Sequence, residues 1–113
     1  MAAVYVSNLV INTGSTFTQT FNLEATTTNS ALDLTGYSAS SQMRKWAGSS
    51  KATTFTATIA SPPTAGVIEI GLTAAQTAEL PAGRQVYNIL ITKGSITETV
   101  VEGMVLVREG VTR

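Results

Sequence analysis

The feature that most constrains the fold is an alternation of apolar and polar residues that returns along the chain. In residues 16–23 and 54–59, apolar side chains fall at every second position except at Gln19, and threonine fills most positions between them. Residues 85–92 follow the same period, with apolar residues also on the second face. Successive side chains of a β-strand point to opposite faces of a sheet, and β-branched threonine suits the solvent face. The alternation therefore predicts half-buried strands.

The strands and the turn signals between them predict one domain with about seven strands. Turn-forming stretches, among them NTGS, AGSSKA, SPPTAG and KGS, follow at intervals of roughly ten residues. The strands are expected at residues 4–11, 16–23, 37–46, 54–59, 67–72, 85–92 and 96–107. This spacing is typical of an antiparallel β-sandwich of immunoglobulin-like size, and we expect a single all-β domain over residues 1–113. Residues 1–11 are expected either as an edge strand or as an arm that packs on a neighbouring subunit.

A short helical turn is expected near residues 73–79. Thr73 can cap it by accepting the backbone N–H of Gln76, and Gln76 stands where a capping box returns a hydrogen bond. Pro81 ends the turn, and Gly83 is expected to take a positive φ. The stretch therefore predicts a structural corner of the domain rather than a reactive site.

Other residues have predicted structural roles. Tyr37 and Tyr87 fall where a tyrosine fills the core of a β-sandwich and donates its hydroxyl to a backbone carbonyl. Leu32 and Leu34 are expected to anchor the polar loop around them to the core. Gly103 lies inside the last expected strand and is predicted to bend it.

The charge balance argues against several classes of partner. Only 12% of the residues are charged, and seven Lys plus Arg balance seven Asp plus Glu. A chain without net charge has no long-range field that attracts polyanions, so no nucleic acid partner is expected.

No apolar run approaches the roughly 18 residues that a membrane span needs, and the first residues lack the pattern of a signal peptide. We expect no membrane partner and synthesis in the cytoplasm.

The sequence offers few residues for catalysis or metal binding. It contains no His and no Cys, which excludes the commonest general base, the commonest nucleophile pairs and most zinc sites. Glu98 and Glu102 are expected on one strand face about 13 Å apart, farther than the carboxylate pairs of glycosidases. A calcium ion needs six to eight oxygen ligands, often from closely spaced Asp and Asn residues, and Asp33 has only Asn29 beside it. We therefore predict a protein that is not an enzyme and binds no metal or cofactor.

Trp46 is the one tryptophan of the chain, and it follows Arg44 and Lys45. Such a residue can stack on a sugar or a base, but a single tryptophan at a strand end more often packs in a core or an interface. A carbohydrate platform would also need several exposed aromatic side chains. Packing in a core or an interface is therefore the favoured interpretation.

Three blocks of sequence occur in an order that resembles a known family. They are DLTGY at residues 33–37, LTAAQTAELPAGRQVY at residues 72–87, and EG at residues 102–103. Together they resemble the N-terminal module of phage baseplate upper proteins, and the short capsid and tail accessory proteins of tailed bacteriophages that use the same small β-sandwich. The resemblance covers nearly the whole chain. The larger baseplate proteins continue into further domains, so a stand-alone accessory protein is expected here.

The resemblance implies a non-enzymatic structural protein of the virion, assembled in the host cytoplasm. It would bind other virion proteins, such as major capsid, tail or baseplate subunits, as a capsid decoration or cement protein or as a tail or baseplate accessory, and would form a homo-oligomer on the particle. The alternative is a carbohydrate-binding or adhesin module that contacts host glycans. The candidate interface residues are Val4, Tyr5, Val6, Trp46, Arg108 and Arg113.

Overall fold

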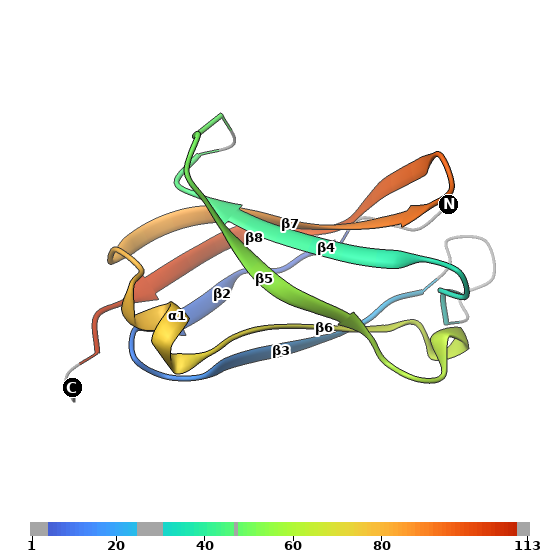
Figure 1. Cartoon of the computed structure of the whole chain (residues 1–113), viewed down its shortest axis with the longest axis horizontal. Helices are drawn as coiled ribbons and strands as arrows, with labels where there is room; N and C mark the ends of the chain where they lie inside the picture. The colour runs from blue at the N-terminus through green and yellow to red at the C-terminus, as the bar shows by residue number, and fades with distance from the viewer. Residues whose placement is uncertain (1–4, 25–30, 47, 111–113) are drawn as a thin grey trace.

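The computed structural model describes residues 5–24, 31–46 and 48–110, and these residues form an all-β fold (Figure 1). Its strands are β1 (Tyr5–Val6), β2 (Leu9–Asn12), β3 (Phe17–Asn22), β4 (Ser38–Arg44), β5 (Ala52–Ile59), β6 (Val67–Leu72), β7 (Gly83–Lys93) and β8 (Ile96–Arg108). A 3-10 turn, η1 (Pro63–Ala65), precedes β6, and a short helix, α1 (Ala74–Ala78), follows it. The predicted strands are thus present, and the prediction of all-β structure is confirmed.

The strands form one mixed sheet that folds over itself. The strand order is β1-β8-β7-β4-β5-β6-β3, and β2 also pairs with β8. β5 belongs to both layers, because Ala52–Phe55 pair with β4 and Thr56–Ile59 pair with β6. One layer therefore holds β1, β2, β8, β7 and β4, and the other holds β6 and β3, which gives a nearly barrel-shaped molecule (Figure 1). An immunoglobulin-like sandwich of two separate sheets is not confirmed.

The expectation of a fully antiparallel sheet is wrong at one edge. β1 and β2 run parallel to β8, with Tyr5 opposite Val101 and Asn12 opposite Arg108. Alternation of side chains does not encode strand direction, because parallel and antiparallel strands share the same period of two. Residues 5–12 thus pair with the last strand of their own chain. The first four residues of the predicted arm lie outside the described residues.

The core lies between the two layers and follows the predicted alternation. Its fully buried side chains are Ile11, Leu23, Leu34, Met43, Ile68, Ile70, Ile89, Ile91, Val100, Val101, Val105 and Val107. Aromatic contacts join Phe17, Phe55 and Tyr87 in turn: the first pair is tilted with ring centroids 5.9 Å apart, and the second is edge-to-face at 6.3 Å. Leu34 is buried and Leu32 partly buried, as expected of loop anchors. The apolar side chains therefore hold the layers together by close packing.

The irregularity in β8 lies at Val100 and not at Gly103. The register changes so that Ile89 faces Val101 while Leu90 faces Thr99, which leaves Val100 as the extra residue of a β-bulge. Val100 and Val101 are both buried for this reason. The predicted bend at Gly103 is therefore wrong.

Gly103 has a different role, which is to permit a close approach. A Cβ atom at this position would lie 2.1 Å from the carbonyl oxygen of Ser7. The hydroxyl of Tyr87 donates a hydrogen bond of 2.6 Å to that same oxygen, which confirms the role predicted for this tyrosine. Tyr37 differs: it is only partly buried, and the Lys93 ammonium lies 5.5 Å from the centre of its ring.

The corner after β6 is built as its sequence predicts. Thr73 accepts the backbone N–H of Gln76 at 3.2 Å, and the side chain of Gln76 accepts the backbone N–H of Thr73 at 2.8 Å. Gly83 begins β7 with a φ of 129°, which favours glycine. The hydroxyl of Thr77, which is fully buried, accepts the N–H of Gly14 at 3.0 Å and donates to the carbonyl of Ser15 at 2.8 Å. These bonds fix the helix to the turn between β2 and β3.

Candidate binding surface

The outward side of the layer that contains β8 carries a group of apolar side chains. Alternation along each strand places them opposite the core, and the strand register brings them together: Val10 faces Leu106, and Val86 faces Met104. Val6 is 75% exposed, and most of the others keep a large part of their surface in contact with solvent. We call this group the outer apolar face, and it consists of Val6, Val10, Val86, Leu90, Met104 and Leu106.

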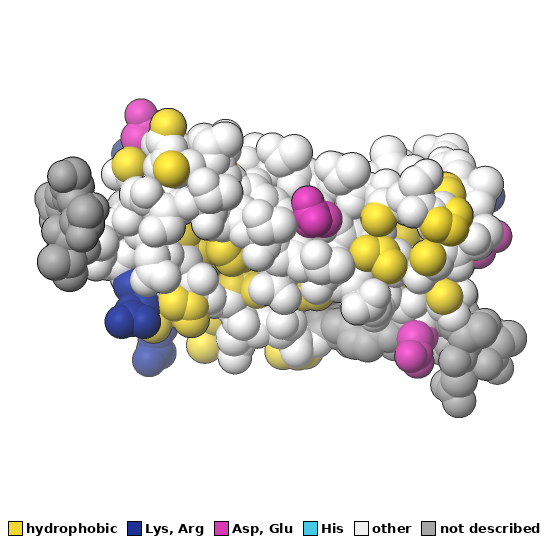
Figure 2. All heavy atoms as spheres, turned by 90° about the horizontal axis from the view of Figure 1, so that it is seen from below, with side chains coloured by type: hydrophobic (Ala, Val, Ile, Leu, Met, Phe, Trp, Pro, Cys, Tyr) yellow, Lys and Arg dark blue, Asp and Glu magenta, His cyan; other side chains and the backbone are white. Residues whose placement is uncertain are grey.

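The second layer has an outward side of different chemistry. The exposed side chains of β3, β5 and β6 there are Thr18, Thr20, Asn22, Thr56, Thr58 and Glu69. Figure 2 views the molecule from the side of this layer and shows large uncharged polar areas, with scattered hydrophobic groups and isolated charges. Small polar side chains of this kind are typical of a solvated sheet face. The two outward sides of the molecule are therefore not equivalent.

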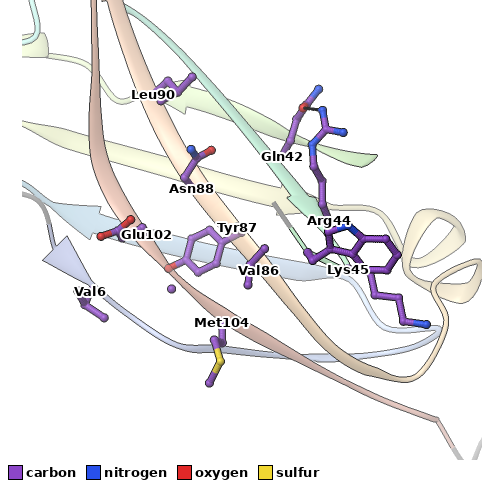
Figure 3. A pocket seen from close by; sticks show the side chains of 12 residues that line it. Val6, Gln42, Arg44, Lys45, Val86, Tyr87, Asn88, Leu90, Glu102 and Met104 are labelled. Carbon is purple, nitrogen blue, oxygen red and sulfur yellow. Dashed lines mark hydrogen bonds between the residues drawn. The ribbon is translucent and has the colours of Figure 1, made fainter. Parts of the chain in front are cut away.

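A hollow of about 680 Å³ lies over the part of the outer apolar face that holds Val6, Val86, Leu90 and Met104. β7 and β8 contribute Val86, Leu90, Glu102 and Met104 to its lining, and β4 contributes polar side chains. Figure 3 shows Arg44 and Lys45 on one side of it, with Val6 and Glu102 on the other. The hollow thus joins a hydrophobic floor to a rim with charged groups.

Trp46 lies at one edge of this hollow, in the turn that follows β4. Its side chain is 59% exposed, so it is not part of the core. Arg44 braces the turn, because its guanidinium donates to the carbonyl of Ser49 and, at 3.1 Å, to the side-chain oxygen of Gln42 (Figure 3). A Cβ atom at Gly48 would lie 3.7 Å from the indole, which places the backbone of the turn beside the ring. The ring is therefore exposed on a supported turn.

A second hollow of about 850 Å³ lies on the other side of the same turn. Trp46 and Lys45 line both hollows, so they form the ridge between them. The residues of the turn and of the α1 corner that line the second hollow are mainly polar, and include Ser50 and Gln76; Thr54 of β5 also lines it. This hollow lacks the apolar strand residues that define the first one.

The structure brings together two of the six predicted interface residues. Val6 and Trp46 lie on opposite sides of the first hollow, since β1 and β4 are separated by β8 and β7. Arg108 is exposed at the end of β8 and does not line the hollow. The backbone of Tyr5 pairs with Val101, and its side chain is outside the described part of the structure. Val4 and Arg113 also lie outside the described residues.

The sequence interpretation did not select most of the outer apolar face. Val10, Val86, Met104 and Leu106 were not among the predicted interface residues, although a signal was present. In a strand with one solvated face, every second residue is polar. The segments that form β7 and β8 instead have apolar residues on both faces of the strand. The apolar residues on the second face were therefore a signal in the sequence of the outer apolar face.

The acidic residues considered for chemistry do not converge. Because of the bulge at Val100, Glu98 faces Ile91 on the inner side of the sheet, whereas Glu102 faces Asn88 on the outer side. The expectation that Glu98 and Glu102 share a face is therefore wrong. Asp33 accepts hydrogen bonds from the hydroxyl and from the backbone N–H of Thr35. Both bonds lower the pKa of the Asp33 carboxyl, and the bond from the hydroxyl has the larger effect. Among the described residues, no three His, Cys, Asp or Glu side chains are grouped to hold a metal ion.

None of the helices in the described ranges has the length and apolar character that a membrane crossing requires. No family model matches the chain, and no curated protein sequence matches it.

Solved structures show where this fold occurs elsewhere. It is similar to the N-terminal domain of phage TP901-1 ORF48, with a TM-score of 0.57 and 8% identity, over 94% of this chain and 97% of that one. It is also similar to InlP of Listeria monocytogenes, with a TM-score of 0.53 and 10% identity over 93% of this chain. This chain covers 27% of the InlP chain. A domain of a phage protein therefore has the same fold at nearly the same length.

Proposed function

We propose that this chain is a non-enzymatic structural protein of a phage virion that binds neighbouring virion subunits. It would act as a capsid decoration or cement protein, or as a tail or baseplate accessory protein. The observation that carries the proposal is the fold shared with the N-terminal domain of a phage protein over nearly all of both chains. The sequence blocks at residues 33–37, 72–87 and 102–103, which resemble the module of baseplate upper proteins, support it independently.

The physical action of such a protein is to bury surface between its neighbours. Interface energy concentrates in a few aromatic, Met or Arg side chains that fill hollows in the partner. The outer side of the β8 layer offers Met104, Arg44 and the exposed Trp46 around one hollow. These side chains give the chain a surface suited to the proposed role. Several copies on one particle would add their individual contacts.

The direct test is to look for the protein in purified particles of a phage that encodes it. Quantitative mass spectrometry should find it in a fixed ratio to the major capsid or tail protein, and cryo-electron microscopy should show its density at a repeated position. Infected-cell extract serves as the control for expression. A protein that is abundant in the extract and absent from mature particles would contradict the proposal.

A second candidate function is a carbohydrate-binding or adhesin module. The observation in its favour is that Trp46 is exposed on a ridge beside a hollow lined by polar residues such as Ser50 and Gln76, and sugars stack on such rings. This function predicts saturable binding on a glycan array that Trp46→Ala abolishes. Ile96→Ala is a matched control, because Ile96 is also exposed but lies at the start of β8, away from both hollows. Equal binding by the two variants would exclude a platform at Trp46.

A further inference from the structure

The charges of this neutral chain are unevenly distributed over its surface. Arg84 and Arg108 project on the outer side of the β8 layer, Arg84 directly opposite Leu106 and Arg108 two residues beyond it. Arg44 faces Val86 at the other side, and Lys45 follows it at the rim of the hollow. Four of the seven basic residues of the chain thus surround the outer apolar face.

Carboxylates are scarce on the same side. Glu98 and Glu102 are the acidic residues of the strands in this layer, as far as the structure describes them, and only Glu102 points outward. Exposed Glu109 directly follows Arg108 beyond the end of β8, so two carboxylates stand against the four basic residues. The outer apolar face therefore has a net positive rim, although the whole chain has no net charge. A rim of one sign selects partners of the opposite sign and repels others.

We infer that the outer apolar face docks on a protein surface that has an apolar centre and a rim of carboxylates, on a virion subunit of a different kind from this chain. The inference rests on the proposed function and adds the surface and the chemistry of its partner. The apolar floor supplies the area to be buried, and the basic rim sets partner choice and orientation.

The apolar centre favours a protein over a nucleic acid. Val10, Leu106, Val86 and Met104 form adjoining pairs of non-aromatic side chains, which neither pair with phosphates nor stack on bases. Nucleic acid sites combine positive charge with aromatic or polar side chains. Burial of these apolar groups against a nucleic acid would leave the phosphates close to a hydrophobic surface. A protein partner gains from both the apolar floor and the basic rim.

The charge also disfavours a second copy of this chain. A two-fold contact places the same patch on both sides, so two positively charged rims would meet. The face is three strands wide, because β1 and β2 follow each other along the same side of β8, and it extends over about seven residues along the strands. Its dimensions of roughly 14 Å by 23 Å give an area well below the ~800 Å² per partner of a standard interface. Attraction between opposite charges must therefore contribute much of the binding, and attachment should weaken as the salt concentration rises.

The experiment compares three variants during assembly of the phage that encodes the protein. Met104→Glu places a charge in the apolar centre, and Arg84→Glu reverses one charge of the rim. Thr20→Glu is the matched control, because Thr20 is exposed on β3 on the outward side of the other layer. Circular dichroism and thermal unfolding of the purified variants verify that each is folded. Mass spectrometry of purified particles then measures their occupancy relative to wild type.

We expect Met104→Glu and Arg84→Glu to reduce occupancy roughly tenfold or more, the loss typical of a central contact, and Thr20→Glu to leave it unchanged. If wild type is present on particles and both face variants are retained as well as the control, the inference is wrong while the proposed function stands. If wild type is absent from particles, both are wrong.

Two further measurements test whether a second copy of this chain or a nucleic acid binds the outer apolar face instead. Sedimentation of the purified protein would reveal a dimer that Met104→Glu dissociates, if the face bound a second copy. Mobility shift with single-stranded DNA would reveal binding that Arg84→Glu abolishes, if the face bound nucleic acid. Either result would overturn the inference, and a monomer that does not bind DNA supports it.

Discussion

At the scale of single residues, the short break between β1 and β2, at Ser7 and Asn8, is held against β8 by contacts that no local sequence pattern shows. Tyr87 reaches from β7 to the carbonyl of Ser7, and Gly103 leaves the room that this carbonyl needs. The side-chain oxygen of Asn8 accepts the N–H of Met104 at 3.1 Å, in place of a backbone acceptor. These contacts keep residues 7 and 8 attached to β7 and β8, although the regular strand pairing is interrupted there. Val6 and Met104, near this interruption, both line the first hollow.

We predict that Tyr87→Phe lowers the free energy of unfolding by about 1–2 kcal/mol, because the Ser7 carbonyl loses its donor while the ring remains packed. Urea denaturation measures the change. Tyr37→Phe is the control and should change stability little, since Tyr37 is only partly buried. A Tyr87→Phe protein as stable as wild type would show that water replaces the hydroxyl at no cost.

The same residue predicts an alkaline dependence of stability. Burial raises the pKa of Tyr87 above its usual value of 10.0, although the side chain of Ser7 acts in the opposite direction. The folded protein therefore holds this proton more tightly than the unfolded chain. The stabilisation is complete below about pH 10 and is lost as the pH rises through the raised pKa. Unfolding midpoints measured across this range should fall less steeply for Tyr87→Phe than for wild type.

At the scale of elements, α1 shows how a helix of five residues is held in place. So short a helix is not stable alone, because its first turn costs more conformational entropy than its hydrogen bonds return. The capping box of Thr73 and Gln76 satisfies its amino-terminal end, and Thr77 fixes it to Gly14 and Ser15. The cap could be predicted from two residues three positions apart. The anchoring by Thr77 could not, because its partners lie more than 60 positions away in the sequence.

We predict that Thr77→Val lowers the free energy of unfolding by about 1–3 kcal/mol, since it keeps the shape of the side chain but leaves the Gly14 N–H and Ser15 carbonyl without a partner. Thr73→Ala removes the cap and should cost about 1 kcal/mol. Chemical denaturation of both variants gives the comparison. A larger loss in Thr73→Ala than in Thr77→Val would mean that the cap, and not the anchoring by Thr77, holds this corner.

The same distinction explains what could be predicted of the fold and the site. Alternation predicted the bounds of β6 and the inward side of β3, because period and turn residues are local properties of the chain. The direction of β1 and β2 and the bulge at Val100 depend on pairing between distant segments. Val6 and Trp46 were each selected from the sequence. That they share one hollow follows from the strand order and could not be foreseen.

At the scale of the whole molecule, the folded sheet gives its strands unequal support. β7 pairs with β4 on one side and with β8 on the other, and its inward side chains are buried in the core. β3 pairs with β6 on one side, at an edge of the described sheet. Strands with fewer partners open more easily in local fluctuations. Stability should therefore be greatest at the centre of the β8 layer.

Hydrogen exchange would measure this difference. We predict that the amides of β7 around Ile89 exchange at a rate set by global unfolding, whereas those of β3 exchange faster through local opening. The comparison is internal to one sample, and corrected protection factors remove the effect of sequence on intrinsic rates. Equal protection in β3 and β7 would show that both layers open in a single cooperative step.

The parallel edge formed by β1, β2 and β8 also determines how the molecule responds to mechanical load. Tyr5 begins this edge opposite Val101, and the chain leaves β8 beyond Arg108, so a pull on the two described ends acts along the strands in opposite directions. The hydrogen bonds between the strands then carry the force together, in shear. A hairpin pulled open from its end breaks its bonds one after another. The edge that holds Val6 in place is therefore also the part of the protein that would resist tension.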